Sequence, residues 1–386
     1  MRDPSQFPRF TDDEMAQRHA TVHALMDEAG VQALLFYAAG SKYAAEVYWL
    51  TDWPGGRESY VLFQKDQEPV VLVQLYNHMP MARVLSVVPD VRWAGADTSE
   101  SMMDLLRERG LDGKKVGLVG SIPYRHYLKM RERFPQAEFK DVGGKFRMLR
   151  TIKSEAEIDR LRIASKLTDE SLRELAKGLR EGIREDELPA LLEPVYLKAG
   201  GYAGIHFMTS MPMRAPHFPV PAQYHSNRRL QRGDCLITEI SGGYWGYTGQ
   251  IHRTFSLGDG PTAEWKDLHA AGVEAFDAIS GVIKDGTSTR EVEEVAEVIH
   301  RRGYNIYDDL LHGASQYPPI IQTKSSKRHK SGDVVFRERM VIVIQPNVIT
   351  RDEKMGLQFG ETLVVRKDGC ETLNAFPREW VVCQGN

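Results

Sequence analysis

The chain has 386 residues, 42% of them hydrophobic and 27% charged, and it carries a formal net charge of -3. This length is enough for two domains with separate cores, and the composition is that of an ordinary globular protein, which excludes a disordered chain. No basic surplus is present to neutralise phosphates, so we expect no nucleic-acid partner.

The cysteines and the amino terminus indicate the compartment. The chain has three cysteines, an odd number, and they are widely spaced: Cys235, Cys370 and Cys383. This favours reduced thiols over a disulfide framework. The amino terminus, MRDPSQFPRF, lacks the apolar core of a signal peptide, and no run approaches about 18 apolar residues. We therefore expect a cytoplasmic protein with no membrane partner.

Predicted helices and strands alternate in the first part of the chain. A capping box, Thr11 with Glu14, begins a helix whose apolar residues recur at helical spacing. The pattern then predicts strands over 31–37, 59–64, 70–74, 115–119 and 137–142, and helices over about 98–110 and 122–134. This alternation predicts a small α/β domain over residues 1–150.

A second domain is expected over residues 151–386. Ser154 and Glu157 form another capping box, and the apolar residues after it fall on one stripe of a long helix. Further helices are predicted over about 185–198, 262–284 and 289–302, and strands cluster over 233–257 and 333–366. We expect helices outside a curved sheet, so the fold class of the whole chain is α/β, or α+β.

The segment 230–255 predicts a buried antiparallel hairpin with its turn at Ser241-Gly242-Gly243. Glu239 lies on the first strand of this hairpin. Gln250 and His252 lie on the second strand and should share a face, because side chains alternate along a strand.

This hairpin resembles the creatinase, aminopeptidase P and prolidase family, whose catalytic fold is called pita-bread. The likeness rests on Gly233-Asp234, Glu239, Gly246-Tyr247 and residues 250–255, and on the entry Arg150, Lys153 and Glu157 into the second domain. The resemblance spans nearly all the chain. It implies an N-terminal creatinase-type domain and a C-terminal pita-bread catalytic domain.

Metal-dependent members of that family hold a pair of metal ions, and the resemblance places their ligand positions on weak donors here. The positions fall on Glu239, Gln250, Gln316, Gln345 and Gly360, and a second register puts His312 in place of Gln316. A glutamine offers only a neutral carbonyl, so three of them cannot neutralise a metal pair that carries about four positive charges. We therefore expect a site with no metal and no other cofactor.

Without a metal, side chains must transfer the protons, and histidine is suited because its ordinary pKa lies near about 6.5. His217 resembles the proton-shuttling histidine of creatinase, and His225 competes with it on spacing. The resemblance also implies that His312 contacts the substrate, and we expect Glu239, His252 and His312 to orient His217 or to stabilise charge. A loop histidine without chemistry is the alternative for His217 and His312.

Two carboxylates are further candidates. Glu239 is flanked by apolar residues, so burial should raise its pKa and make it a possible acid, base or nucleophile, unless it pairs with Arg253 or His252. Glu361 is a candidate for substrate binding, although it follows Gly360 and should point to the opposite face unless a bulge turns it. We expect Gln250, Gln316 and Gln345 to donate and accept hydrogen bonds at an amide-like group of the substrate.

The loop 52–57, with the sequence DWPGGR, resembles the creatinase loop whose arginine crosses a dimer interface to bind a substrate carboxylate. A guanidinium suits a carboxylate because it donates two parallel hydrogen bonds, and we expect the Trp53 ring to pack on an apolar part of the substrate. The resemblance thus implies a homodimer in which Arg57 reaches the neighbouring subunit. An ordinary turn with an exposed arginine is the alternative.

These features predict a metal-independent, creatinase-like hydrolase that cleaves a C-N bond, of amide or amidine type, in a small carboxylate-bearing substrate by histidine acid-base catalysis. One alternative is a metal-dependent Xaa-Pro dipeptidase or aminopeptidase with altered ligands. A lyase acting on a small carboxylate substrate and a non-catalytic pita-bread binding protein are further alternatives.

Overall fold

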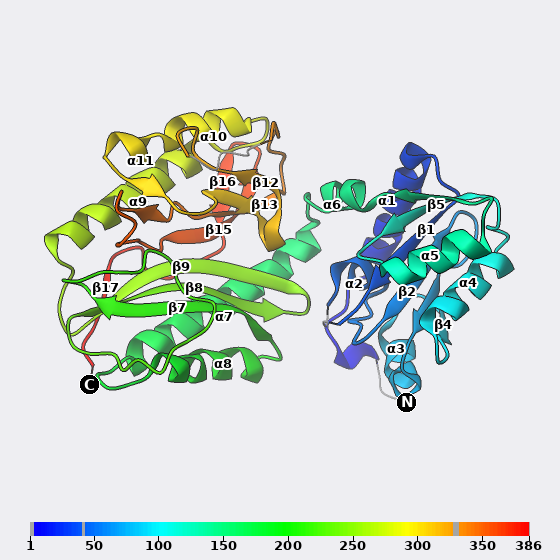
Figure 1. The fold of residues 1–386 in the computed structure, drawn as a ribbon, viewed down its shortest axis with the longest axis horizontal. Helices are drawn as coiled ribbons and strands as arrows, with labels where there is room; N and C mark the ends of the chain where they lie inside the picture. The colour runs from blue at the N-terminus through cyan, green and yellow to red at the C-terminus, as the bar shows by residue number, and fades with distance from the viewer. Residues whose placement is uncertain (1–3, 41–42, 327–331, 386) are drawn as a thin grey trace. The chain divides into compact units, whose positions relative to one another are not determined.

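The computed structural model describes residues 4–40, 43–326 and 332–385. Backbone contacts divide the chain into two compact units, Met1–Arg150 and Thr151–Asn386, which are drawn in Figure 1. Within the described residues, no helix combines the length and apolarity that crossing a membrane requires.

The first unit is a mixed six-stranded sheet with the strand order β4-β3-β2-β1-β5-β6. Its strands are β1 (Ala33–Ala38), β2 (Ser59–Gln64), β3 (Val70–Val73), β4 (Asp90–Trp93), β5 (Lys115–Val119) and β6 (Glu138–Asp141). Its helices are α1 (Asp12–Ala29), α2 (Ala45–Thr51), α3 (Met79–Leu85), α4 (Thr98–Glu108), α5 (Tyr124–Arg133) and α6 (Gly143–Leu149). Every residue of β1 is buried, because a separate apolar core packs on each face of the sheet.

The second unit is built on a long curved sheet with the strand order β12-β11-β13-β15-β9-β8-β7, to which β16 and β17 add. These strands are β7 (Tyr202–Pro212), β8 (Asp234–Tyr244), β9 (Tyr247–Leu257), β11 (Leu311–Gly313), β12 (Tyr317–Ile321), β13 (Val341–Ile344), β15 (Gly360–Arg366), β16 (Gly369–Thr372) and β17 (Val381–Cys383). A separate pair joins β10 (Asn305–Ile306) to β14 (Val348–Ile349).

Helices cover one face of this sheet in two groups, as Figure 1 shows. The helices are α7 (Glu155–Gly178), α8 (Pro189–Lys198), α9 (Ala263–Val282), α10 (Thr289–Ala296) and α11 (Val298–Arg301). The first two pack on β7 to β9, and α9 packs on β13, each over its own apolar core. The predicted capping box at Ser154 and Glu157 is present and begins α7. This mixed α/β architecture, with a curved sheet under helices, confirms the expected fold class.

The predicted turn of the central hairpin is wrong by a few residues. The strands β8 and β9 continue through Ser241-Gly242-Gly243, and the chain reverses at Trp245 and Gly246, where φ is 42° and 85°. Two consecutive positive φ angles suit a tight hairpin turn whose twist matches the strands. The register that results places Glu239 opposite His252 and Gln250 opposite Ser241.

The sequence pattern did not predict several of the helices and strands that the structure contains. The helices α2 and α3 and the strands β4 and β7 are present where no clear periodicity was found. In β7, exposed and part-buried residues mix without alternation, because the strand lies at the edge of the sheet. Short helices such as α2 carry too few turns for a periodic pattern.

Candidate active site

A row of polar side chains crosses five neighbouring strands of the second unit. Glu239 pairs with His252 between β8 and β9, and His252 pairs with Gly360 between β9 and β15. At the other end, His312 on β11 pairs with Val343, two residues before Gln345 on the segment that follows β13. Paired residues of antiparallel strands share a face, so these residues point to one side of the sheet.

That side is opposite to the helices. Ile240, Ile251 and Ile344 are immediate neighbours of Glu239, His252 and Gln345, and they belong to the cores under α7 and α9. We call the polar side chains on the opposite side the polar cluster, and its members are Glu239, Gln250, His252, His312, Gln345 and Gln358.

The carboxyl group of Glu239 has a raised pKa. The Gln250 Nε2 group donates to Glu239 Oε1 over 2.8 Å, and the carboxyl is only part-exposed. Burial raises the pKa of Glu239 to about 8, and the nearby negative charge of Asp308 adds to the increase. Both the protonated and the ionised form are therefore populated near neutral pH.

His252 is neutral and fully engaged. Its Nε2 lies 3.1 Å from Gln250 Nε2, and its Nδ1 lies 2.9 Å from Gln358 Oε1. Complete burial lowers the pKa of His252 to about 3. A ring whose two nitrogens are both hydrogen-bonded cannot carry protons without breaking the network, so His252 holds its neighbours in place.

His312 and Gln345 each keep one buried polar atom without a hydrogen-bond partner. The His312 Nδ1 lies 2.8 Å from the Gly313 carbonyl oxygen, and Gln345 Nε2 donates to the Asp309 carbonyl oxygen over 3.0 Å. Among the described residues, His312 Nε2 and Gln345 Oε1 have no partner. Burial lowers the pKa of His312, and the hydrogen bond to the Gly313 carbonyl oxygen and the charge of Asp309 act against this decrease.

The residues at the ligand positions do not fit a metal pair. In the part of the chain that the structure describes, no group of three or more His, Cys, Asp or Glu side chains could hold a metal ion. The NH2 groups of Gln250 and Gln345 both donate hydrogen bonds to oxygen atoms of the protein. A Cβ at Gly360 would lie 2.5 Å from the Ile344 carbonyl oxygen and 2.9 Å from Gln345 Cα, so the backbone leaves no room for a ligand side chain there.

Glu361 does not join the polar cluster. It pairs with Ile251 and Ile344, which lie on the helix side of the sheet, and its carboxylate is buried between Arg253 and Arg378. Burial alone would raise the pKa of Glu361, but the two guanidinium groups outweigh it and lower the pKa. The substrate-binding role expected for Glu361 is therefore replaced by a structural one, since no bulge turns it toward the cluster.

The proposed proton shuttle, His217, lies in the exposed loop between β7 and β8, with its Nδ1 3.3 Å from the Ala215 carbonyl oxygen. This loop touches the segment that carries Gln358, because a Cβ at Gly356 would lie 1.7 Å from the Pro219 carbonyl oxygen. Within the described residues, His217 makes no hydrogen bond or ion pair with the polar cluster. His225, the competing candidate, has its Nε2 2.8 Å from the His206 carbonyl oxygen.

Three other candidates lie elsewhere. Gln316 ends a short 3-10 turn, and its side chain is outside the described part of the structure. Arg57 is exposed in the first unit, which leaves it available for a partner. Trp53 is only 5% exposed within the apolar core of the first unit, so its ring cannot pack on a substrate as expected.

Sequence reasoning missed Gln358 and Asp308. A signal for Gln358 was present, because residues two apart on a strand share a face and Gln358 precedes Gly360 by two. Asp308 acts through the field it exerts on Glu239, from a segment just before β11. No local pattern indicates such a contact.

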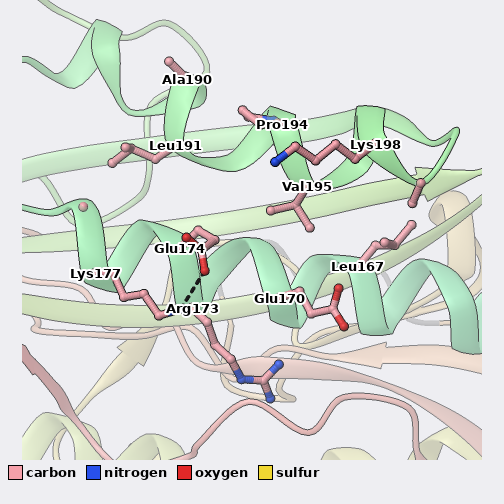
Figure 2. Close-up of a pocket in the computed structure, with 12 residues that line it drawn as sticks. Leu167, Glu170, Arg173, Glu174, Lys177, Ala190, Leu191, Pro194, Val195 and Lys198 are labelled. Carbon is pink, nitrogen blue, oxygen red and sulfur yellow. Dashed lines mark hydrogen bonds and ion pairs between the residues drawn. The ribbon is translucent and has the colours of Figure 1, made fainter.

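A separate hollow lies between α7 and α8, and Figure 2 shows its lining. It has a volume of about 980 Å³, and Leu167, Leu191 and Val195 form part of its wall. Glu174 and Lys177 at its edge pair with each other at 2.7 Å. None of the polar cluster lines this hollow, so it adds nothing to the site.

Comparison with known proteins identifies two regions of the chain. Residues 159–367 match the model of metallopeptidase family M24, and residues 18–152 match that of the creatinase/prolidase N-terminal domain. An Xaa-Pro dipeptidase of Pyrococcus horikoshii is 24% identical over 96% of this chain and all of its own length. An uncharacterized hydrolase/peptidase of Sinorhizobium fredii is also 24% identical, over 99% of each chain.

Solved structures share the fold. The X-Pro aminopeptidase of Thermotoga maritima superposes with a TM-score of 0.81 over 95% of this chain and 99% of its own, at 23% identity. The prolidase of Pyrococcus horikoshii gives 0.78 over 95% and 100%, also at 23% identity. The M24 model alone spans over half of the sequence, and the chain belongs to metallopeptidase family M24, a family of hydrolases, with a creatinase/prolidase-type domain before its pita-bread domain.

Proposed function

We propose that this protein hydrolyses the C-N bond of a small amide-type substrate and that Glu239 transfers the protons. The observation that carries the proposal is the pKa of Glu239, which burial raises to about 8. A general acid-base group works best when its pKa lies near the working pH, because both forms are then available.

The proposed steps use only side chains of this chain. Ionised Glu239 takes a proton from water as the oxygen of that water attacks the substrate carbonyl carbon. Protonated Glu239 then returns the proton to the leaving nitrogen as the C-N bond breaks, which restores the carboxylate. Gln250 holds one carboxyl oxygen throughout. The bare Nε2 of His312 is suited to accept a hydrogen bond from the substrate.

This proposal moves the main proton-transfer role from His217 to Glu239. His217 stays a predicted second group, on the loop that touches the segment carrying Gln358. The homodimer with Arg57 at the neighbouring subunit, the carboxylate on the substrate and the cytoplasmic location also stay proposals.

The second candidate is a metal-dependent Xaa-Pro dipeptidase, and the comparisons favour it over a creatinase-like activity. An Xaa-Pro dipeptidase, an X-Pro aminopeptidase and a prolidase match this chain over nearly its whole length. Against it stand the three glutamines and the crowded Gly360 at the ligand positions.

Elemental analysis with a chelator challenge distinguishes the two candidates. The purified protein would be incubated with Xaa-Pro dipeptides and with small amides and cyclic amidines, before and after chelation and after addition of Mn2+, Co2+ or Zn2+. We expect turnover that chelation leaves unchanged. Dipeptide turnover that chelation abolishes and Mn2+ restores would establish the metallopeptidase instead.

The variant Glu239→Gln tests the assigned role. We expect turnover to fall by at least about a hundredfold, because general acid-base catalysis contributes about 10² to 10⁴. Glu132→Gln, on an exposed helix face of the first unit, is the matched control. Product analysis adds a further distinction, since a lyase would release an unsaturated product and a binding protein would leave every ligand intact.

A further inference from the structure

A continuous line of hydrogen bonds runs from Gln358 to Glu239. Gln358 Oε1 lies 2.9 Å from His252 Nδ1, His252 Nε2 lies 3.1 Å from Gln250 Nε2, and Gln250 Nε2 lies 2.8 Å from Glu239 Oε1. Gln358 and His252 are fully buried. Water therefore does not compete for their polar atoms.

The line has a direction. An amide NH2 group only donates, so Gln250 Nε2 requires a bare nitrogen at His252 Nε2. A neutral imidazole carries one hydrogen, which then lies on Nδ1 and points to Gln358 Oε1. The two hydrogens of the Gln250 amide are thereby used, one toward His252 and one toward Glu239.

Gln358 stands at the start of this line and decides the direction. If its oxygen did not accept from Nδ1, the ring could carry its hydrogen on Nε2, where it would face the Gln250 NH2 group as donor against donor. The Gln250 amide would then turn over and present its oxygen to Glu239. The ionised carboxylate and an amide oxygen repel each other, so Glu239 would lose, in its ionised form, the donor that holds it.

We propose that Gln358 is a positioning residue that fixes His252 in the tautomer with hydrogen on Nδ1 and so directs the Gln250 amide hydrogens to Glu239. This inference rests on the proposed function and deepens it, because it names what orients the proton-transferring carboxyl. Gln358 acts through His252 and Gln250, which link it to Glu239 by hydrogen bonds.

The test observes the tautomer directly and needs no substrate. The full-length protein is labelled with 15N-histidine, and the ring signals of His252 are assigned by their loss in His252→Asn. Nitrogen chemical shifts distinguish a protonated from a bare ring nitrogen. We expect a protonated Nδ1 and a bare Nε2 near neutral pH. A hydrogen on Nε2 in the unmodified protein, which is the reversed line, overturns the proposal.

Two variants separate positioning from simple packing. Gln358→Glu also offers an acceptor oxygen and should keep the hydrogen on Nδ1, whereas Gln358→Leu offers none and should lose that preference. Gln64→Leu is the control, because Gln64 is a part-buried glutamine of the first unit whose amide donates to the Arg109 carbonyl oxygen. Retention of the Nδ1 hydrogen in a folded Gln358→Leu protein contradicts the proposal.

Kinetics give an independent readout on any amide that the protein turns over. Gln358→Leu should lower kcat about tenfold with KM nearly unchanged, since a misdirected hydrogen bond disturbs the reacting carboxyl more than substrate binding. Gln358→Glu should recover part of the loss. An unchanged kcat in Gln358→Leu contradicts the positioning role, whereas failure of the tautomer to depend on Gln358 contradicts it even if no amide is turned over.

Discussion

At the scale of the residue, Glu239 shows how a side chain gains function from its surroundings. An ordinary glutamate has a pKa of 4.5, and burial together with the charge of Asp308 raises that of Glu239 to about 8. Gln250 supplies a hydrogen bond but no charge, so the carboxyl is held in place without being forced to ionise. His252 contributes by remaining neutral.

The raised pKa of Glu239 predicts a pH-dependent effect of Glu239→Gln on stability. A folded pKa above the unfolded one stabilises the protein below the unfolded value, and this stabilisation is lost as pH rises through the folded value near 8. The variant and the unmodified protein should therefore unfold at similar temperatures at about pH 4 and diverge up to about pH 8, where the variant should be more stable by a few degrees. Thermal unfolding at a series of pH values measures this. Glu132→Gln should show no such divergence.

At the scale of the element, two adjacent residues at the start of β15 have different roles: one lies at the candidate site and the other stabilises the fold. Gly360 faces the polar cluster and Glu361 faces the helices, because side chains alternate along a strand. Glu361 accepts hydrogen bonds from Arg253, Arg378 and Thr372, which ties β15 to β9 and to the segment near the carboxyl end.

Glu361→Gln should therefore destabilise the second unit. The side chains of Arg253 and Glu361 are each 2% exposed, and breaking a buried ion pair leaves the other charge uncompensated, at a cost of about 3–5 kcal/mol. Chemical denaturation measures the loss. Asp333→Asn serves as the control, because its pair with Arg290 is exposed to solvent on both sides and should matter little.

Gly360→Glu tests whether the missing ligand can simply be restored. The new Cβ would lie 2.5 Å from a backbone oxygen that cannot move aside, so we expect a loss of about 1–3 kcal/mol and no gain of bound Mn2+. Denaturation and elemental analysis check both points. Gly369→Glu, where a Cβ meets open space, should cost much less. Metal binding by a stable Gly360→Glu protein would contradict the view that the backbone excludes a ligand.

At the scale of the whole molecule, each unit has its own core, and the proposed chemistry resides in the second. In the first unit, the side chain of Trp53 is buried and that of Arg57 is exposed. An arginine that completes the site of a neighbouring subunit would explain the resemblance of its loop to that of creatinase. This role requires a homodimer.

Subunit mixing tests that assembly. Arg57→Ala and Glu239→Gln should each be nearly inactive as homodimers, but in a mixed dimer one site would receive both unmodified residues. Random mixing should restore roughly a quarter of the unmodified activity. Sedimentation establishes the dimer itself. No recovery in proven mixed dimers would place Arg57 outside the neighbouring site.

The sequence alone determined the class of fold, the capping box that begins α7 and the family, because these depend on local patterns and on residues whose order the chain preserves. It also indicated the polar side chains at the ligand positions. It placed the hairpin turn wrongly, since Trp245 carries no turn signal of its own.

Only the tertiary structure decided which of these side chains act together. Gln358, Asp308 and Glu239 lie on separate segments, and their mutual effects depend on burial and on distances between strands that no local pattern encodes. The same holds for Gly360 and Trp53, whose roles follow from how closely other parts of the chain approach them. The residue types determine which reactions are chemically available. Packing determines the local dielectric and the directions of the hydrogen bonds, and these decide which side chain can take part.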